Sequence, residues 1–359
     1  MPREIEDSVV VITGASSGIG RATALAFAEQ GASVALAARS EETLREVADE
    51  CESAGGQALV VPTDVTDEEA VRELARRTVE RFGRIDTWVN NAGVMVYGFL
   101  EEVPSEAYRQ VIETNLFGQI HGARAVVPHF KEQGGGVLIN ISSMWAKVSS
   151  PYVSAYVTSK FGILGFSECL RQGLHDQKDI HVCTILPVSV DTPIFRHAGN
   201  YTDHGAKPVP PVLDPGRVVK QILRNARRPR PETTVGPTGY LLTFAHAVTP
   251  KLYDFLVPHV FQWGAFSSES VEQGPGNVFE PMPEWNRVSG GWRSGRGAKV
   301  RRAALAGGAV LTPLLAWWLT QQRGLERKPA GDSRSGRSQW LRRGPTAMLA
   351  ILAKGTARS

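Results

Sequence analysis

Apolar residues in the first part of the chain fall into short, continuous runs that alternate with amphipathic stretches. The runs are rich in β-branched residues and occupy positions 8–14, 33–39, 58–64, 85–90, 136–143 and 181–187. Continuous apolar runs separated by helical patterns are typical of parallel strands that helices cover on both faces. The pattern therefore predicts an α/β fold built on a doubly wound parallel sheet of about seven strands.

Beyond residue 195 the pattern becomes irregular. A polar, proline-bearing stretch at 195–216 predicts a loop or lid beside the site. A helix at 215–227 with a strand near 233–235 would complete a first domain at 1–238. Residues 239–271 predict a helical extension. Its apolar face could cover a cleft, contact a partner subunit, touch a membrane or pack on its own domain. Gly, Pro, Ser and Trp without periodicity indicate a linker at 272–298.

The C-terminal region differs from the rest of the chain in charge. From residue 291 onward there are 14 basic and two acidic residues, a net charge of +12, whereas the whole chain carries +4. An uncharged run at 303–320 lies within this basic tail (299–359), close to the ~20 apolar residues that span a bilayer. We expect a membrane-associated segment there with anionic lipid as its partner. Basic charge also attracts nucleic-acid phosphates, but the apolar runs favour lipid over any specific nucleic acid.

Cysteine usage and the N-terminus indicate the compartment. The three cysteines are widely spaced, which fits neither a disulfide scaffold nor a metal site. The N-terminus enters an apolar strand at once and carries no signal-peptide pattern. We therefore expect a cytoplasmic protein that binds no metal, with the tail as its membrane contact.

A glycine-rich sequence, TGASSGIG (13–20), follows the first predicted strand and opens the first predicted helix. Its glycines permit a tight turn and a close approach to a pyrophosphate, which the free N–H groups and dipole of a helix N-terminus attract. Ser16 and Ser17 add hydroxyl donors. A tight turn can also require glycine for packing alone. The position of this sequence between a predicted strand and a predicted helix favours a phosphate-binding role.

The end of the second predicted strand bears on the choice of dinucleotide. In NAD-binding folds an acidic residue near this point binds the ribose 2′-OH. Here the acid is absent and Arg39 could bind a 2′-phosphate bidentately, the alternative being a solvated surface arginine. We expect NADP(H) rather than NAD(H). Asp64, at the end of the third strand, could accept from the adenine amino group or cap the next helix.

Tyr156 and Lys160 lie four residues apart, with Ser143 upstream. Side chains at i and i+4 share one face of a helix, so the ammonium could lower the phenol pKa from its usual ~10. The serine hydroxyl could hold a substrate oxygen. Such a pair alone is more often an ordinary helix surface. Asn115 adds a second signal, because asparagine is a poor helix former and this one lies in a predicted helix.

Taken together, these motifs resemble the short-chain dehydrogenase/reductase family over residues 7–195, and more loosely to 235. The motifs that match the family in order and spacing are TGASSGIG, Asp64, NNAG (90–93), Asn115, ISS ending at Ser143, and Tyr156 with Lys160. The segment PVSVDTP (187–193) is similar to the family's segment around the nicotinamide. It departs at Val188, where the family commonly has glycine.

The resemblance implies a role for each matching residue. Tyr156 would be the general acid/base, Lys160 its pKa-lowering partner and a ribose ligand, and Ser143 the donor to the substrate oxygen. Asn115 would hold the water of a proton relay to Lys160. The expected cofactor-binding residues are Gly14, Ser16, Ser17, Gly18, Ile19, Gly20, Arg39, Asp64, Val65, Asn91, Ala92, Gly93, Tyr156, Lys160, Pro187, Val190 and Thr192.

The expected activity is reversible hydride transfer between NADP(H) and a carbonyl or secondary alcohol. The apolar stretch at 239–263 and the tail favour an apolar small-molecule substrate. The family also implies a homodimer or homotetramer. The alternative is a catalytically silent NADP-binding regulator or a membrane-tethered scaffold, which the complete set of Ser143, Tyr156 and Lys160 disfavours.

Overall fold

A seven-stranded parallel sheet forms the centre of the computed structural model, which describes residues 4–293 of the chain. Its strands are β1 (Val9–Thr13), β2 (Ser33–Ala38), β3 (Gln57–Pro62), β4 (Thr87–Asn90), β6 (Gly136–Ile141), β7 (Ile180–Pro187) and β10 (Glu232–Val235). They are ordered β10-β7-β6-β4-β1-β2-β3. The order reverses direction between β1 and β4, which is the switch point where such sheets bind ligands. The predicted doubly wound, Rossmann-type sheet is confirmed.

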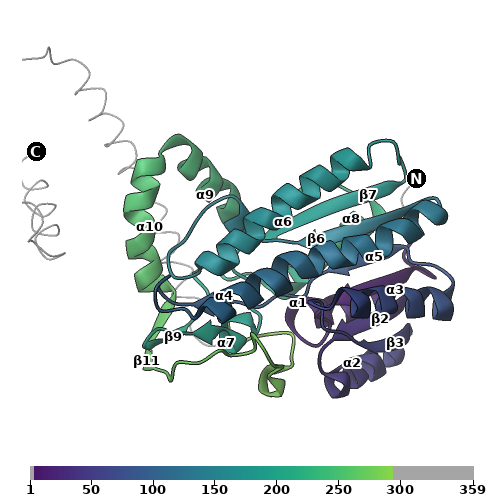
Figure 1. Ribbon diagram of the computed structural model, residues 1–359, viewed down its shortest axis with the longest axis horizontal. Coiled ribbons are helices and arrows are strands. Elements are labelled where there is room, and N and C mark those ends of the chain that lie inside the picture. Colours follow the sequence, from purple (N-terminus) through teal and green to yellow (C-terminus); the bar gives the residue numbers. More distant parts are fainter. Residues whose placement is uncertain (1–3, 294–359) are drawn as a thin grey trace, which may run out of the picture. The chain divides into compact units, whose positions relative to one another are not determined.

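Helices cover both faces of this sheet (Figure 1). One face carries α1 (Gly18–Ala28), α2 (Glu41–Ser53) and α8 (Pro215–Arg227). The other carries α3 (Glu68–Phe82), α5 (Gly118–Glu132) and α6 (Ser154–Gly173). Each layer buries its own apolar cluster against the strands, with Phe27 and Ile222 in the first and Leu74 and Phe130 in the second. Burial on both faces explains why the strands read as continuous apolar runs.

Side-chain caps close the N-termini of α2 and α3 but not that of α1, which follows the glycine-rich turn. Ser40 caps α2 by accepting from the backbone N–H of Thr43, and Asp67 caps α3 by accepting from Glu69 and Ala70. Within the described chain, α1 has no such side-chain cap, although Ser17 stands at its N-cap. Its first N–H groups therefore need another partner.

A π-helix interrupts the long helix that crosses the second face. It spans Glu113–Phe117, between α4 (Ser105–Ile112) and α5. Asn115 lies at its centre and is fully buried. A π-turn inside an α-helix is uncommon and often marks a functional site. The helix-breaking signal of this asparagine thus corresponds to a real irregularity.

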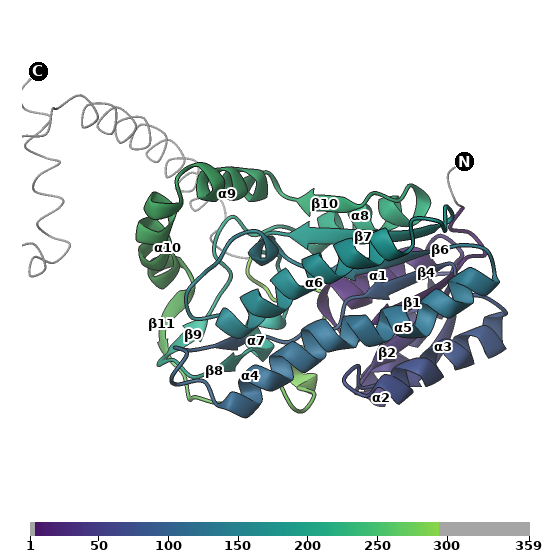
Figure 2. The same cartoon turned by 45° about the horizontal axis from the view of Figure 1, so that its top comes forward.

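Smaller elements surround the carboxyl end of the sheet (Figure 2). Two short strand pairs form there, β5 (Val96–Tyr97) with β8 (Gly199–Asn200) and β9 (His204–Ala206) with β11 (Phe266–Ser270). The loop expected at 195–216 contains the short helix α7 (Ile194–His197) as well as β8 and β9. The apolar stretch at 239–263 forms two helices, α9 (Pro237–Val248) and α10 (Pro250–Gly264), because Thr249 and Pro250 end one and begin the other.

The segment expected to be a linker packs against the domain over its described part, residues 272–293. It contains a short 3₁₀ helix, Pro283–Trp285, and buries Val278 completely. The basic tail at 299–359, including the run at 303–320, lies outside the described residues. Among the helices of residues 4–293, none has the length and apolar character needed to cross a membrane.

Val188, the departure from the family pattern, is accommodated by a glycine elsewhere. Gly236 has a φ of +113°, and a Cβ built on it would lie 2.7 Å from the Val188 side chain. The missing side chain at Gly236 therefore provides the space for the valine. The backbone at Val188 remains bonded to the sheet, since the Val188 N–H donates to the Val235 carbonyl at 3.2 Å.

Candidate active site

The glycine-rich turn connects β1 to α1 at the switch point of the sheet. Gly14 has a φ of +66°, and a Cβ on it would lie 2.8 Å from the Ala92 Cα. A Cβ on Gly20 would lie 2.1 Å from the Gly14 carbonyl oxygen. Both positions therefore require glycine. The turn brings the uncapped N-terminus of α1 to the cleft, and this donor set suits a pyrophosphate. Ser16, Ser17 and Ile19 remain half-buried around it.

The NNAG motif fixes this turn from the side of β4. The Asn91 side-chain amide donates to the carbonyl oxygens of Thr13 and Gly14, at 3.0 and 3.1 Å. The Thr13 hydroxyl in turn accepts from the backbone N–H of Asn91 and of Ala92. In this structure the Asn91 side chain therefore holds the glycine-rich turn. Gly93 adds space, since a Cβ there would lie 3.2 Å from the Asn115 side-chain oxygen.

Asn115 uses its side chain to hold the chain that follows β4. Its amide donates to the Val94 carbonyl at 2.9 Å and to the Ser159 hydroxyl at 3.1 Å, and its oxygen accepts from the Val94 N–H at 2.8 Å. Both amide hydrogens are thus committed to protein partners. For the water of the expected relay, the side chain therefore keeps a lone pair on its oxygen but no further N–H donor.

Tyr156, Lys160 and Ser143 come together at the carboxyl end of β6. Tyr156 and Lys160 lie on one face of α6, with the ammonium nitrogen 5.1 Å from the centre of the phenol ring. They are 7% and 3% exposed, so the reading of this pair as a helix surface is excluded. The Lys160 ammonium donates to the Ile141 carbonyl at 3.1 Å. Ser143, the N-cap of a 3₁₀ turn, accepts from the Trp145 N–H at 3.2 Å.

Burial controls the protonation of this pair. It raises the pKa of the Tyr156 phenol, and the hydrogen bond with Ser143 opposes this effect only in part. The net direction is opposite to the expected lowering. Burial also lowers the pKa of Lys160 to about 7. Removal from water disfavours the charged form of each group. The ammonium therefore stabilises a phenolate only in the fraction of molecules that carry the proton on Lys160.

The residues expected around the adenosine end lie beyond β2 and β3. Arg39 donates from both terminal nitrogens to backbone carbonyls of the C-terminal segment, Phe279 and Asn277, each at 2.7 Å. Burial lowers the pKa of Arg39, while the nearby carboxylates of Asp64 and Glu280 act in the opposite direction. Asp64 accepts from the backbone and hydroxyl of Thr66, and the following helix is capped by Asp67. Val65 is buried against Gly118.

The segment after β7 lies opposite the N-terminus of α1. Val190 and Thr192 are both 6% exposed, and a Cβ on Gly18 would meet the Thr192 side chain at 3.4 Å. Pro187 ends β7 and pairs in register with Val235 of β10. The structure thus brings the expected nicotinamide segment against the glycine-rich turn.

An aromatic enclosure around Tyr156 was not predicted. Seven aromatic residues pack in the same cluster as Tyr156: Tyr97, Trp145, Tyr152, Phe195, Phe261, Phe266 and Trp292. The Trp145 ring meets the Tyr156 ring edge-on at 5.7 Å. Tyr97 is fully buried, and its hydroxyl has no hydrogen-bond partner within residues 4–293. No local pattern could reveal the enclosure, because its members come from segments far apart in the chain.

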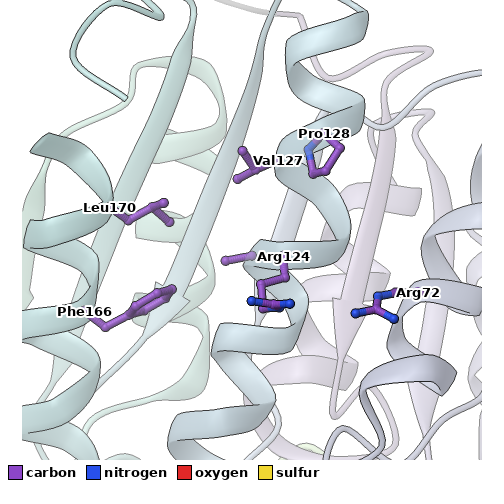
Figure 3. A pocket seen from close by; sticks show the side chains of 7 residues that line it. Arg72, Arg124, Val127, Pro128, Phe166 and Leu170 are labelled. Carbon is purple, nitrogen blue, oxygen red and sulfur yellow. The ribbon is translucent and has the colours of Figure 1, made fainter. Parts of the chain in front are cut away.

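A second apolar hollow lies away from these residues, on the outer surface of the second helical layer. Figure 3 shows its lining from α3, α5 and α6, with Val127, Phe166 and Leu170 around it and Arg72 and Arg124 at its side. None of the expected site residues lines it. It is therefore distinct from the site at the carboxyl end of the sheet.

Comparison with known proteins identifies the family. The family model for short chain dehydrogenases matches residues 8–201. An uncharacterized oxidoreductase, YxnA, from Bacillus subtilis is 34% identical over 328 residues, covering 88% of this chain and 91% of that protein. A protein named 11-beta-hydroxysteroid dehydrogenase A from Sesamum indicum is 32% identical over 272 residues, covering 72% of this chain and 75% of that protein.

Solved structures agree with these sequence relatives. A short chain dehydrogenase/reductase from Burkholderia phymatum in complex with NAD has a TM-score of 0.63 at 26% identity, covering 70% of this chain and 96% of that one. An alcohol dehydrogenase from Thermococcus sibiricus complexed with 5-hydroxy-NADP has a TM-score of 0.56 at 28% identity, covering 64% and 96%. From the matched motifs, the sheet topology and these relatives, the chain belongs to the short-chain dehydrogenase/reductase family of oxidoreductases.

Proposed function

We propose that the protein is an NADP(H)-dependent oxidoreductase that interconverts a carbonyl and a secondary alcohol on an apolar substrate. The observation that carries this proposal is the buried pair of Tyr156 and Lys160, with Ser143 hydrogen-bonded to the phenol, in a fold that leaves the N-terminus of α1 without a side-chain cap. When bound, the dinucleotide supplies or accepts the hydride. The protein residues hold the reactants and move the proton.

Proton transfer is assigned to Tyr156. In the reduction direction its hydroxyl donates a proton to the alkoxide that develops as the carbonyl accepts hydride. Ser143 donates a hydrogen bond to the same oxygen and stabilises its charge. The raised pKa of Tyr156 keeps the phenol protonated and ready to donate. Lys160, when protonated, stabilises the phenolate left behind, and Asn115 holds a water through which the proton is replaced.

Arg39 supports NADP(H) as the dinucleotide. It stands after β2, where an acidic residue would favour a free ribose hydroxyl, and its guanidinium can form charge-assisted bonds to a 2′-phosphate. Family membership leaves the choice open, because one similar structure was solved with NAD and another with 5-hydroxy-NADP. The NADP(H) assignment therefore depends on Arg39 alone.

The aromatic enclosure supports an apolar substrate. The Phe261 and Phe266 rings close over Tyr152 and Tyr97 at centroid distances of 5.1 to 6.5 Å. Such a surface binds hydrocarbon well and offers few polar partners. The name of one relative, 11-beta-hydroxysteroid dehydrogenase A, points in the same direction, because a steroid skeleton is hydrocarbon. The Tyr97 hydroxyl, buried and without a hydrogen-bond partner among residues 4–293, adds a polar group to this enclosure near Tyr156.

For partners, we propose a homodimer or homotetramer and contact of a cytoplasmic protein with an anionic membrane. The first follows from the family, and light scattering of the purified chain measures it. The second is supported by α9, where Tyr240, Leu241 and Phe244 are 65%, 61% and 63% exposed. An apolar helix face combined with a basic tail suits the surface of an anionic bilayer.

Replacement of Tyr156 by phenylalanine removes the proton donor and leaves the ring. We expect Tyr156→Phe to lower kcat at least about 100-fold, with little change in the Kd for NADPH. The measurement is NADPH oxidation with a series of ketones of increasing hydrophobicity. Tyr108→Phe on α4 is the matched control and should keep its turnover. Undiminished turnover of the Tyr156 variant would remove the assignment.

Protonation of Lys160 should appear in the pH profile of carbonyl reduction. Its pKa of about 7 lies below the usual value, so the ammonium is present below pH 7 and lost above it. We expect kcat/KM for reduction to fall as pH rises through about 7, whereas the phenol stays protonated throughout. In Lys160→Arg the cation persists at every accessible pH, so this inflection should disappear. An identical inflection in that variant would contradict the role of Lys160.

Replacement of Arg39 tests the choice of dinucleotide. Loss of charge-assisted bonds worth about 1.5–3 kcal/mol should weaken NADPH binding in Arg39→Ala roughly 10- to 100-fold more than it weakens NADH binding. Titration of cofactor fluorescence gives both Kd values. The control is Arg45→Ala, an arginine of α2 that is exposed and paired with Glu41. An equal effect on both dinucleotides would refute a specific 2′-phosphate contact.

Vesicle binding tests the proposed membrane contact. We expect the full chain to co-sediment with vesicles containing phosphatidylserine and much less with pure phosphatidylcholine, since the basic tail requires anionic lipid. The double substitution Leu241→Glu and Phe244→Glu should reduce binding severalfold by introducing charge into the apolar face. Leu100→Glu, at another exposed leucine, serves as the control. Equal sedimentation of all three proteins would exclude α9 from the contact.

A further inference from the structure

The C-terminal segment of the described chain runs along the rim of the dinucleotide cleft. We name residues 277–293 the strap. Figure 1 shows its yellow-green trace between α7 and α2, far from the helices that precede it in the chain. Three sets of contacts attach it to the domain, and each set lies at a position expected to bind one part of the dinucleotide.

The first attachment is at the adenosine end. The carbonyl oxygens of Asn277 and Phe279 accept from the two terminal nitrogens of Arg39, each at 2.7 Å. Val278, between them, is completely buried and packs with Val94 and Val96. This buried side chain fixes the two carbonyls on either side of it. Arg39 keeps three further N–H groups with which it can bind a phosphate.

The second attachment is at the N-terminus of α1, where the pyrophosphate is expected. The Gly18 N–H donates to the Arg287 carbonyl at 3.0 Å. Beside it, the Asn286 carbonyl accepts from Arg21 at 2.6 Å, and the Asn286 amide donates to the Thr43 hydroxyl at 2.9 Å. The strap thus joins the starts of α1 and α2. It takes the first N–H group of the uncapped helix end, that of Gly18.

The third attachment is at the expected nicotinamide segment. The Trp292 indole N–H donates to the Thr192 carbonyl at 3.0 Å, and its backbone N–H donates to Asp191 at 2.9 Å. The Arg196 guanidinium contacts two strap indoles, 4.1 Å from the centre of the Trp285 ring and 4.3 Å from that of the Trp292 ring. These two cation–π contacts add to the hydrogen bonds that hold this end of the strap.

The strap borders the cleft without filling it. Ser16, Ile19 and Asn91, on the floor of the cleft, keep intermediate exposure beneath it. A segment that acted as a plug would bury these residues. We propose that the strap is part of the dinucleotide site and closes over the bound cofactor, so that the cofactor enters and leaves only when the strap opens. This inference depends on the dinucleotide binding described under the proposed function.

A single methyl group can test this inference in the full-length protein. A Cβ on Gly290 would lie 2.4 Å from the Thr192 carbonyl oxygen and 2.3 Å from the Trp292 indole nitrogen. Gly290→Ala should therefore force the strap away from its third attachment. The matched control is Gly274→Ala, because a Cβ on Gly274 meets nothing within 4 Å. We expect NADPH to dissociate at least about 10-fold faster from the Gly290 variant in stopped-flow displacement, and at the wild-type rate from the control.

Protease protection supplies a readout that does not depend on turnover. Trypsin cleaves after Arg287 and Arg293, which lie on the strap. If the strap closes over the cofactor, saturating NADPH should slow cleavage of the wild-type strap severalfold, and Gly290→Ala should lose that protection. If Gly290→Ala folds poorly, Trp292→Phe keeps a ring against Arg196 but removes the indole N–H. This second variant should also release NADPH faster.

Three results would overturn the inference. The first is tighter NADPH binding by the Gly290 variant together with faster tryptic cleavage of the wild-type strap in the presence of NADPH. This result would show that the strap blocks the site and that the cofactor displaces it. Wild-type release rates in both strap variants would show a strap without influence on the site. Faster release from the Gly274 control as well would remove the specific role of the third attachment. Each result requires that NADPH binds the wild type, whereas absence of any NADPH or NADH binding would refute the proposed function itself.

Discussion

The burial of Lys160 is the constraint on which the arrangement of the site depends. An ammonium that is 3% exposed needs a hydrogen-bond partner, and the Ile141 carbonyl at the end of β6 provides it. That bond joins α6 to the sheet at the point where Ser143 follows β6. The Ser142 hydroxyl adds a second link by donating to the Lys160 carbonyl at 3.1 Å. The positions of Tyr156 and Ser143 therefore follow from how the chain accommodates one buried cation.

A chain of buried amides supports this arrangement from inside the sheet. Asn90 at the end of β4 accepts from the Trp88 indole at 2.7 Å and donates to Asn140 of β6 at 2.9 Å. Asn140 then donates to Ser167 of α6 at 2.9 Å. Fully satisfied buried networks fix one relative position of the elements they join. Here the network fixes α6 against the strands, and α6 carries both Tyr156 and Lys160.

The sheet and the reactive trio could be predicted because their signals are local. Strand runs such as 8–14 depend on the burial of both faces, and Tyr156 with Lys160 depends on helical spacing. The roles of individual side chains in capping and in proton transfer depended on their surroundings in the folded chain. The residue that caps α3 is Asp67 and not Asp64, and burial reversed the expected direction of the Tyr156 pKa. Neither effect can be read from spacing, because each depends on which groups the folded chain removes from water.

Contacts between distant parts of the chain could not be predicted from the sequence. Arg39 binds carbonyls about 240 residues away in sequence, and backbone carbonyls carry no signature of side-chain type. Glycine and proline without periodicity indicated a linker, yet the same composition permits the extended path of the strap. The free-energy cost of closing a loop rises only slowly with the length of the loop. A few indole and guanidinium contacts can therefore hold the strap in place. The proposed dinucleotide site is therefore bordered by the part of the chain whose sequence pattern is least regular.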